Sequence, residues 1–391
     1  MKLAVIGGAG RQALAAIYDF VEHESVEKIL LIDVFADTLK SRVTFLNSDK
    51  IEYQIIDALN TEELARALDS YDACLNCTSH LFNLPVMEAC VLSRTNYTDL
   101  GGLFHWAKKQ LLQDERFKKA GITGIVGSGT APGMVNVMAR YAVDRLDSVE
   151  SVRILDAAAE PAAAETGFVP PYALNTLMDE FTVNNFEFRN GEMVELPPFS
   201  GEETACFPDP IGKRALFNMI HSEVATMPVY FAEKGIRNVS FKLALPKTFT
   251  ERLQFLMELG FGSKTPINVK GTSVVPRDVL IALVEKPVGD EDLPPPRDDD
   301  LESLRVIVSG QKEGRSVTYQ VESMLHPYEK WNMATGPFSV GFPAAVTTRL
   351  LGSGQIAEKG FFSGEAVIDP ETYFAELAKR DIRVQVLVTG R

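Results

Sequence analysis

The stretch Leu3-Ala-Val-Ile-Gly-Gly-Ala-Gly-Arg-Gln-Ala13 decides the fold, because it joins a short apolar run to a helix through a cluster of glycines. Residues 3–6 predict a buried strand, and apolar residues at helical spacing over 11–21 predict a helix. A strand that leads through a tight turn into a helix begins a βαβ unit. We therefore expect the chain to open with a parallel sheet.

Within this stretch, Gly8-Ala-Gly-Arg-Gln-Ala13 fits the G-x-G-x-x-G/A pattern of a dinucleotide-binding turn. Gly8 permits the tight turn, Gly10 lets the backbone approach a pyrophosphate, and the small Ala13 lets the helix pack close to the sheet. The N–H groups at the start of the helix carry positive partial charge toward the phosphates. The alternative is a tight turn without a ligand. The residues expected at the cofactor here are Gly8, Gly10, Arg11 and Gln12.

Two carboxylates follow the next two predicted strands. Asp33 ends Leu30-Leu-Ile-Asp33, at roughly the spacing from the glycines that a ribose-binding acid requires. Such a carboxylate accepts hydrogen bonds from the ribose hydroxyls of NAD and repels a 2′-phosphate, so NAD is favoured over NADP. Lys40 and Arg42 keep NADP as an alternative, and Asp33 could instead cap the next helix. Asp57 is a candidate for the adenine side, with capping or simple solvation as the alternatives.

The first third of the chain alternates between strands and helices. Apolar strands separated by amphipathic helices predict a parallel sheet covered on both faces, which right-handed crossovers make a doubly wound Rossmann sheet of the α/β class. Asn76, Cys77 and Thr78 end the fourth strand, where the ligand crevice of such a sheet opens, so we expect them at the cofactor. The predicted strands are 28–34, 52–57, 72–78, 97–100 and 122–126, and the predicted helices are 36–46, 61–68, 85–93 and 104–120.

The pattern changes after about residue 150, where alternating strands predict an α+β domain with a mostly antiparallel sheet. A turn at 310–315 joins the last two of these strands as a hairpin. Residues 289–300 combine six acids with three consecutive prolines, so we expect an exposed loop. The predicted strands are 149–156, 238–245, 278–285, 304–309, 316–323 and 382–388, and the predicted helices are 172–184, 249–259, 343–351 and 370–379.

Composition and charge exclude several classes of protein. The 391 residues are 46% hydrophobic and 24% charged, which is typical of a globular enzyme of two or three domains. The net charge of −14 argues against nucleic acids and anionic membranes as partners. The apolar runs are too short to span a membrane, and the first strand leaves no room for a signal peptide, so a cytoplasmic protein is expected.

The cysteines are too few for a disulfide framework. Cys74 and Cys77 form a C-x-x-C pair, but they fall in a predicted strand, where this spacing places them on opposite faces. We interpret them as small buried side chains and expect no metal site.

Together these segments resemble the saccharopine dehydrogenase family, which includes saccharopine reductases, lysine 6-dehydrogenases and carboxynorspermidine dehydrogenases. The matching pieces span nearly the whole chain, although residues 157–215 match no subfamily. They are the turn at 8–13, Asn96-Tyr-Thr-Asp-Leu-Gly-Gly102, Gly129-Thr-Ala-Pro-Gly-Met-Val-Asn136, His221-Ser-Glu-Val-Ala-Thr-Met-Pro228, Met333-Ala-Thr-Gly336, and Gly360-Phe-Phe-Ser-Gly-Glu365 with 370–382.

The resemblance implies a dinucleotide-binding domain (1–130), a substrate-binding and dimerisation domain (131–340), and a C-terminal segment (341–391) that packs back on the first domain. It also implies a homodimer and an NAD(P)-dependent enzyme that transfers hydride at a carbon–nitrogen bond of an amino-acid or polyamine derivative. Two alternatives stay open. One is the oxidative deamination of a primary amine, as in lysine 6-dehydrogenases. The other is a dinucleotide-binding sensor or scaffold without turnover.

Several polar residues are candidates for proton transfer and substrate binding. His80 follows the fourth strand and has a side chain suited to general acid–base chemistry. Tyr97 and Asp99 lie two residues apart on one strand, so they share a face. From later segments, Asn136, Arg214, His221 and Glu223 are candidates for binding a carboxylate or an ammonium group of the substrate. For each candidate the alternative is a structural or surface role.

Overall fold

A seven-stranded parallel sheet forms around the N-terminal residues in the computed structural model, which describes residues 1–160, 168–284 and 296–390. Its strand order is β17-β6-β5-β4-β1-β2-β3. The central strands are almost entirely buried, as near-continuous apolar strands covered on both faces require. The predicted doubly wound α/β sheet is confirmed. The strands are β1 (Lys2–Ile6), β2 (Lys28–Asp33), β3 (Ile51–Ile55), β4 (Ala73–Asn76), β5 (Asn96–Asp99), β6 (Thr123–Val126) and β17 (Gly360–Ser363).

Helices connect these strands, and the strand order reverses at β1, so the carboxyl ends of β1 and β4 open a crevice for a ligand. The prediction of one helix over 104–120 is wrong. The chain breaks at Leu112 and Gln113, because Leu112 is 80% exposed and Asp114 begins a new helix with acids in its first turn. The helices are α1 (Ala13–Glu22), α2 (Ala36–Leu46), α3 (Thr61–Leu68), α4 (Asn83–Ser93), α5 (Phe104–Leu111) and α6 (Asp114–Ala120), with the 3-10 turn η1 (His80–Phe82) before α4.

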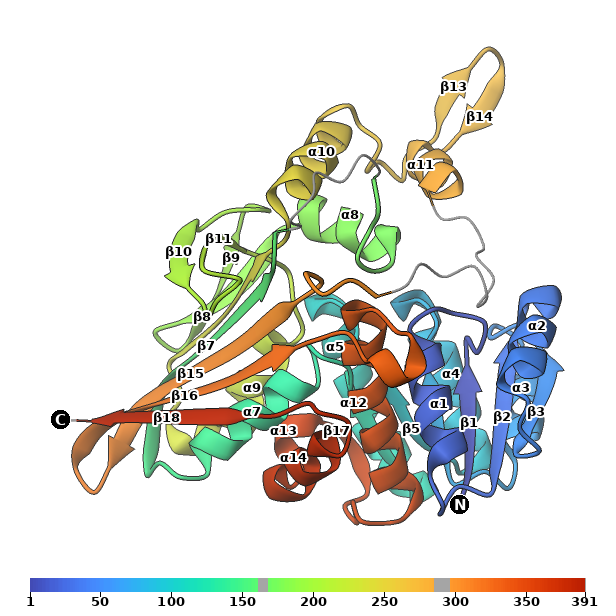
Figure 1. Ribbon diagram of the computed structural model, residues 1–391, viewed down its shortest axis with the longest axis horizontal. Coiled ribbons are helices and arrows are strands. Elements are labelled where there is room, and N and C mark those ends of the chain that lie inside the picture. The colour runs from blue at the N-terminus through green and yellow to red at the C-terminus, as the bar shows by residue number, and fades with distance from the viewer. Residues whose placement is uncertain (161–167, 285–295, 391) are drawn as a thin grey trace.

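A second, nine-stranded sheet lies beside the first (Figure 1). Its pairings are antiparallel except that between β12 and β7, and β15 and β16 form the predicted hairpin. The mostly antiparallel second sheet is confirmed. Its strands are β7 (Ser148–Ala158), β8 (Asn185–Arg189), β9 (Glu192–Leu196), β10 (Glu203–Cys206), β11 (Lys213–Asn218), β12 (Asn238–Ala244), β15 (Glu302–Lys312), β16 (Arg315–Leu325) and β18 (Gln385–Gly390).

Three helices accompany this sheet, and a small unit projects beyond it (Figure 1). The helices are α7 (Met134–Val143), α8 (Leu174–Thr182) and α9 (Glu223–Tyr230), and the projecting unit comprises α10 (Lys247–Glu258), β13 (Ile267–Val269), β14 (Thr272–Val274) and α11 (Pro276–Val284).

The predicted strand at 278–285 is wrong, because α11 occupies this place. Arg277 and Leu280 are buried while Val279 and Leu283 are exposed, which is a helical rather than an alternating pattern. A proline at the first position of the helix fits this reading. The expected exposed loop at 289–300 falls mostly outside the described residues.

The C-terminal elements divide between the two sheets. The long helix α12 (Thr335–Gly352) packs against α1, β4 and β5, and β17 extends the parallel sheet beside β6. In contrast, β18 pairs with β16 of the second sheet. The short α13 (Gly364–Val367) and α14 (Pro370–Ala378) pack against α7.

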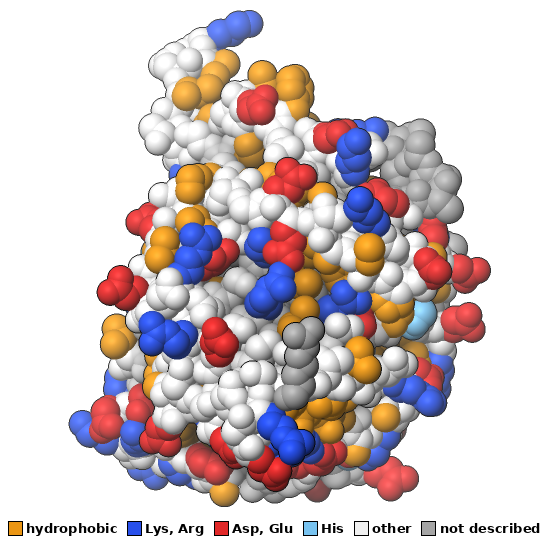
Figure 2. Space-filling model, turned by 90° about the vertical axis from the view of Figure 1, so that its left-hand side faces the viewer, with side chains coloured by type: hydrophobic (Ala, Val, Ile, Leu, Met, Phe, Trp, Pro, Cys, Tyr) orange, Lys and Arg blue, Asp and Glu red, His pale blue; other side chains and the backbone are white. Residues whose placement is uncertain are grey.

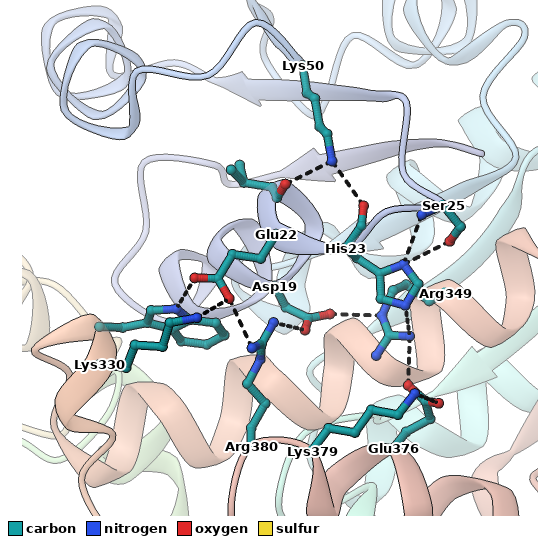
Figure 3. A network of polar contacts seen from close by, with 12 residues as sticks. Asp19, Glu22, His23, Ser25, Lys50, Lys330, Arg349, Glu376, Lys379 and Arg380 are labelled. Atoms are coloured by element: carbon teal, nitrogen blue, oxygen red, sulfur yellow. Dashed lines mark hydrogen bonds and ion pairs between the residues drawn. The ribbon is translucent and has the colours of Figure 1, made fainter.

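A buried network of ion pairs joins these C-terminal helices to α1 (Figure 3). Arg349 of α12 donates to Asp19 of α1 at 2.8 Å and to Glu376 of α14 at 3.0 Å, and Arg380 reaches Asp19 at 3.1 Å. Arg349 also contacts the ring of His23 at 2.9 Å. The network thus fixes the C-terminal segment to the first helix of the parallel sheet.

Basic and acidic side chains are interspersed over the face of the molecule drawn in Figure 2. The excess of acids is therefore not gathered into one patch there. Within the residues that the structure describes, no helix has the length and apolar character needed to cross a membrane.

Candidate active site

The glycine turn after β1 has the close packing that a dinucleotide-binding turn needs. Gly7 has a φ of +78°, and a Cβ there would lie 2.9 Å from the carbonyl carbon of Cys77. The left-handed residue of the turn is thus Gly7, one position before the pattern matched in the sequence. A Cβ on Gly8 would lie 3.0 Å from the Cβ of Leu31, so Gly8 is required by its approach to β2.

Two charged side chains, Arg42 and Asp33, form hydrogen bonds with the backbone of this turn. Arg42 of α2, which is buried, donates from Nη1 to the carbonyl oxygens of Gly8 at 2.7 Å and Gly10 at 2.6 Å. Asp33 accepts the N–H of Ala9 at 2.9 Å through Oδ2, and those of Val34 and Phe35 at 2.7 and 3.2 Å through Oδ1. Because the carbonyls point to Arg42, the turn can present N–H groups to a ligand.

Those N–H groups belong to Arg11 and Gln12. Among the described residues, none accepts a hydrogen bond from either backbone nitrogen. They precede a ten-residue helix, whose dipole favours an anion at this end. The expected adenosine side is more open, since Asp57 is exposed and its carboxylate accepts the N–H of Leu59 at 2.9 Å. Phe35 and Leu59, which are more than 60% exposed, offer apolar surface beside it.

Beneath the carboxyl ends of β4 and β5 lies a chain of buried hydrogen bonds. Asn76 accepts from the hydroxyl of Thr78 at 2.7 Å and donates to Asn83 at 2.9 Å. Asn83 in turn donates to Gln110 at 3.2 Å, and Gln110 donates to Asp99 at 2.5 Å. Asn76 and Thr78 therefore belong to a buried hydrogen-bond network. Thr78 is partly exposed, whereas Asn76 is buried.

Asp99 is the centre of this hydrogen-bond network. Its Oδ2 also accepts the hydroxyl of Tyr97 at 2.7 Å, and its Oδ1 accepts the N–H groups of Gly101 and Gly127, both at 2.8 Å. Burial raises the pKa of Asp99, and these donors counter part of that effect. Burial also raises the pKa of Tyr97. The two residues share a face, as predicted, and they tie together the loops that follow β5 and β6.

The cysteines near this edge are free thiols. Cys74 is buried against Cys90 rather than Cys77, and burial raises the pKa of both Cys74 and Cys77. Cys77 lies beside the glycine turn, as the approach of Gly7 shows. Among the described residues, no three His, Cys, Asp or Glu side chains are placed so that they could hold a metal ion.

His80 stands where the first sheet meets the second domain. It lies 5.5 Å from the ring of Trp106, centroid to centroid, and is buried. Burial lowers the pKa of His80, while Asp179 on α8 partly opposes this. Asp179 itself pairs with Arg277 at 2.6 Å and with Lys264 at 3.0 Å. A neutral imidazole therefore faces the charged end of α8.

His221 and Glu223, two of the predicted substrate residues, lie together at the start of α9. Nδ1 of His221 lies 2.7 Å from Glu223, and its ring stacks on Phe241 of β12 at 3.7 Å. Burial alone would lower the pKa of His221, but the carboxylates of Glu223 and Glu180 together outweigh burial and raise it. Glu223 is completely buried.

Three carboxylates that sequence reasoning missed surround this pair. Asp156 of β7 and Glu302 of β15 are hydrogen-bonded to each other, and Glu180 of α8 bonds the hydroxyl of Tyr172 at 2.5 Å. Burial raises the pKa of Glu180 to about 7. The available signal was Asp156, a lone acid within an otherwise apolar run of β7. We call Asp156, Glu180, Glu223 and Glu302 the acidic cluster.

The two other predicted substrate residues lie elsewhere. Arg214 of β11 pairs with Glu160 at 2.8 Å and donates to the carbonyl of Leu245 at 2.9 Å. Asn136 accepts the N–H of Gly133 at 2.8 Å and donates to Glu365 at 2.8 Å. Asn136 therefore braces the loop after β6 against the C-terminal segment.

Helix α12 links the glycine turn to the acidic cluster. A Cβ on Gly341 would lie 2.4 Å from the carbonyl oxygen of Gln12, and Ser339 donates to Glu302 at 3.3 Å. Two residues of one helix thus contact the dinucleotide turn and the cluster. The expected cofactor and the acids lie on two sides of the same helix start.

Comparisons with known proteins agree over nearly the full chain. Residues 3–125 match the family model described as "Saccharopine dehydrogenase NADP binding domain", and residues 129–382 match "Saccharopine dehydrogenase C-terminal domain". The carboxynorspermidine synthase of Vibrio alginolyticus is 27% identical over 367 residues, which cover 88% of this chain and 85% of the relative. The carboxyaminopropylagmatine dehydrogenase of Synechocystis sp. is 21% identical and covers 100% of this chain and 98% of its own.

Solved structures show the same fold. The saccharopine dehydrogenase (L-Glu forming) of Saccharomyces cerevisiae superposes with a TM-score of 0.72 at 12% identity, covering 99% of each chain. The homospermidine synthase of Legionella pneumophila, in complex with NAD, gives a TM-score of 0.71 at 12% identity and covers 99% of this chain and 91% of its own. At this identity the likeness concerns the fold.

Proposed function

The chain belongs to the saccharopine dehydrogenase family, and we propose that it transfers a hydride between a nicotinamide dinucleotide and a carbon–nitrogen bond of a small polyamine derivative. The observation that carries the proposal is the place of α12, which contacts both the glycine turn and the acidic cluster. A dinucleotide on the turn and an amine at the acids would lie on neighbouring faces of this helix. The relatives named for polyamine synthesis support the amine class.

The residues present fit a bound dinucleotide. The free N–H groups of Arg11 and Gln12 would take the pyrophosphate, and Asp33 would take a ribose hydroxyl. A carboxylate has about four acceptor positions, and Asp33 already accepts three N–H groups, so it has room for one more donor. When bound, the nicotinamide ring donates or accepts the hydride.

We favour NAD over NADP. Asp33 places negative charge where a 2′-phosphate would lie, and Arg42 is buried under the turn rather than free to pair with a phosphate. The family model's printed description names NADP, so the choice between the two cofactors is a test of Asp33.

His80 is our candidate for proton transfer. In the reductive direction the imine carbon gains a hydride and its nitrogen gains a proton; in the oxidative direction the amine loses both, and water then hydrolyses the imine. A buried, neutral imidazole at the domain boundary can accept a proton in one direction and return it in the other. Tyr97 and Asp99 are hydrogen-bonded to each other and to both loops, so we assign them a positioning role.

Steady-state absorbance of the reduced nicotinamide tests the proposal on the purified chain. The panel pairs each cofactor with carboxylated polyamines, diamines plus an aldehyde, saccharopine and lysine. We expect turnover with a polyamine derivative. Oxidation of free lysine alone would favour the deaminase alternative, and tight cofactor binding without turnover on the whole panel would favour a sensor.

A His80→Gln variant sharpens this test. We expect kcat to fall by about 10²–10⁴-fold. The Kd for NAD should stay unchanged, because the N–H groups expected to bind the pyrophosphate belong to Arg11 and Gln12 and not to His80. The exposed His105→Gln variant is the matched control. Wild-type turnover in the His80 variant would remove that residue from the chemistry.

A further inference from the structure

The projecting unit exposes large apolar side chains in pairs on three of its elements. In α10 and α11 the members of a pair are four residues apart, and in β13 they are two residues apart, so each pair lies on one face of its element. Hydrophobic side chains are visible on this unit at the top of Figure 2. Their exposed fractions range from 37% to 65%. We call them the apolar face, which comprises Phe255 and Leu259 at the end of α10, Ile267 and Val269 of β13, and Val279 and Leu283 of α11.

Helix α10 is apolar on two opposite sides. Phe249 and Leu253 are buried in the core of the molecule, and Phe249 stacks on Phe168 with 5.0 Å between the ring centroids. Phe255 follows Leu253 by two residues, which is roughly 200° around a helix, so it points away from the buried side. A helix that is apolar all round is normally covered all round. The described chain covers α10 on one side only, because Phe255 remains 58% exposed.

The hairpin β13–β14 has no other strand beside it. It forms a separate two-stranded sheet, and five of its six strand residues are exposed. An isolated hairpin is marginally stable in water and needs a surface to pack against. The described chain offers no such surface at the hairpin, which points away from the body of the molecule (Figure 1).

The charge of the projecting unit indicates which molecule can cover it. Residues 247–284 carry five basic and three acidic side chains, a net charge of +2, in a chain whose net charge is −14. The other residues therefore carry −16, so two copies repel each other through the rest of the molecule. A contact through the two projecting units keeps the acidic parts apart. A basic partner, by contrast, is attracted to the acidic parts and not to this unit.

We propose that the apolar face packs against the apolar face of a second copy of this chain, across a two-fold axis. Such a contact is self-complementary, since the same residues meet from both sides. A standard interface takes about 20–30 residues from each partner, which the 38 residues of 247–284 can supply. Exposed apolar patches of this kind mark protein–protein contacts.

The contact reaches the candidate active site, because the projecting unit is tied to α8. Arg277 of α11 donates to Asp179 of α8 at 2.6 Å and to Oδ1 of Asn175 at 3.0 Å. Lys264 pairs with Asp179 at 3.0 Å. Helix α8 also carries Glu180 of the acidic cluster. A second copy that holds the projecting unit in place therefore holds this helix in place.

Sedimentation velocity on the full chain, over a range of protein concentrations, tests the proposal. We expect the wild-type chain to form a dimer. The double variant Phe255→Lys, Leu283→Lys should weaken self-association by about 30-fold or more, because it places like charges on both sides of the contact. The matched control is Leu387→Lys on β18, whose side chain is 58% exposed like that of Phe255, and it should dimerise as the wild type does. All three positions are exposed, so both variants should keep the wild-type melting temperature.

Hydrogen exchange locates the contact without any substitution. Exchange of the backbone amides is measured on the wild-type chain at concentrations below and above the dissociation constant of the dimer. We expect slower exchange in the dimer over 255–259, 267–274 and 279–283, and also in α8. Exchange in β18 should be the same at both concentrations.

Three results would overturn the proposal. A wild-type chain that stays monomeric at every concentration would mean that no second copy covers the apolar face. A dimer that survives in the double variant but dissociates in Leu387→Lys would show that β18 forms the contact. Slower exchange over the apolar face without any change in α8 would remove the connection to the candidate active site. None of these readouts depends on turnover, so they leave the proposed function untouched.

Discussion

The two halves of the candidate site treat their polar groups in opposite ways. At the dinucleotide edge, the two buried charged groups are fully engaged: Asp99 accepts four donors, and Arg42 holds two carbonyl oxygens of the turn. In the acidic cluster, Asp156 and Glu223 each keep a buried oxygen without a partner. The carboxylate at the centre of the first region is therefore fully hydrogen-bonded, whereas two carboxylates of the second region are not.

This difference separates two roles that a polar residue can have near an active site. A fully hydrogen-bonded group stabilises the fold and fixes the geometry of the loops around it. An unpartnered group destabilises the free protein and gains its partners from the ligand, which is a trade between stability and function. Removing a side chain from each region should therefore change stability in opposite directions.

The largest effect is expected for Asp99→Ala. It leaves the hydroxyl of Tyr97, the amide of Gln110 and the N–H groups of two loops without their acceptor in a buried place. We expect the free energy of unfolding to fall by about 3–5 kcal/mol, measured by denaturant titration. The control is Asp57→Ala, which lies two residues after β3 of the same sheet but accepts one exposed N–H and should cost about 1 kcal/mol or less.

The sharpest form of this experiment sets Asp99→Ala against Glu302→Gln. The comparison fails if both variants destabilise the protein equally, because the acids of the cluster would then be as well compensated as Asp99. If Asp99→Ala were as stable as the wild-type protein, the groups that donate to Asp99 would have other hydrogen-bond acceptors.

Arg42→Met should give the next largest effect. It removes the donor to the carbonyls of Gly8 and Gly10, so the turn loses its support while the apolar stem is retained. We expect a loss of about 1–3 kcal/mol in stability and a Kd for NAD raised about tenfold, measured by denaturation and by calorimetry. Lys40→Met, on the exposed side of the same helix, should change neither. If Arg42→Met kept the stability and the NAD affinity of the wild-type protein, the hydrogen bonds of Arg42 to the turn would not be needed for either.

Much of the first region could be predicted because its signals are local. Helices α2 and α3 begin and end at the predicted residues, and Asn60 caps α3 through the N–H of Glu63. The turn was identified from adjacent glycines, although its left-handed residue is Gly7. Arg42 was noted only as a possible phosphate ligand, since its contact with the turn spans 34 residues of sequence.

The acidic cluster could not be predicted, because its members meet only through tertiary structure. Asp156 and Glu302 come from strands that are far apart in the sequence, and nothing in either strand indicates that it pairs with the other. His221 and Glu223 were predicted from their chemistry as substrate residues of the second domain, and not from any expected contact with Asp156 or Glu302. The prediction of a strand at 278–285 was wrong because a short apolar run is compatible with both a strand and a helix.

The choice between NAD and NADP tests Asp33, which is hydrogen-bonded less completely than Asp99 but more completely than the acids of the cluster. Asp33 accepts three N–H groups yet is only partly buried, so it both shapes the turn and remains open to a ribose. The double variant Asp33→Ser, Phe35→Arg should raise the affinity for NADP relative to NAD by about tenfold, since a guanidinium replaces the carboxylate near the 2′ position. Phe35→Arg alone is the control. An unchanged ratio of the two Kd values would mean that Asp33 does not read the ribose.

The smallest effect is expected at the network that joins α1 to the C-terminal helices (Figure 3). Nε2 of His23 lies 2.9 Å from the guanidinium of Arg349, which can only donate, so the imidazole must stay neutral to accept. Burial, and then the charge of Arg349, lower the pKa of His23 in the folded protein. Below the unfolded value of about 6.5, the unfolded chain therefore binds a proton that the folded chain does not.

Stability from His23 should consequently be complete above about pH 6.5 and decline as the pH falls below it. Because the ring is partly exposed, we expect the decline to be less than about 1 kcal/mol, measured by urea titration between pH 7.5 and pH 5. A His23→Gln variant should lose this part of the pH dependence, while the exposed His105→Gln should keep it. A decline that survives His23→Gln would mean that carboxylates carry it. Glu22 and Glu376 would then be the first carboxylates to test, because their ion pairs outweigh burial and lower the pKa of both groups in the folded protein.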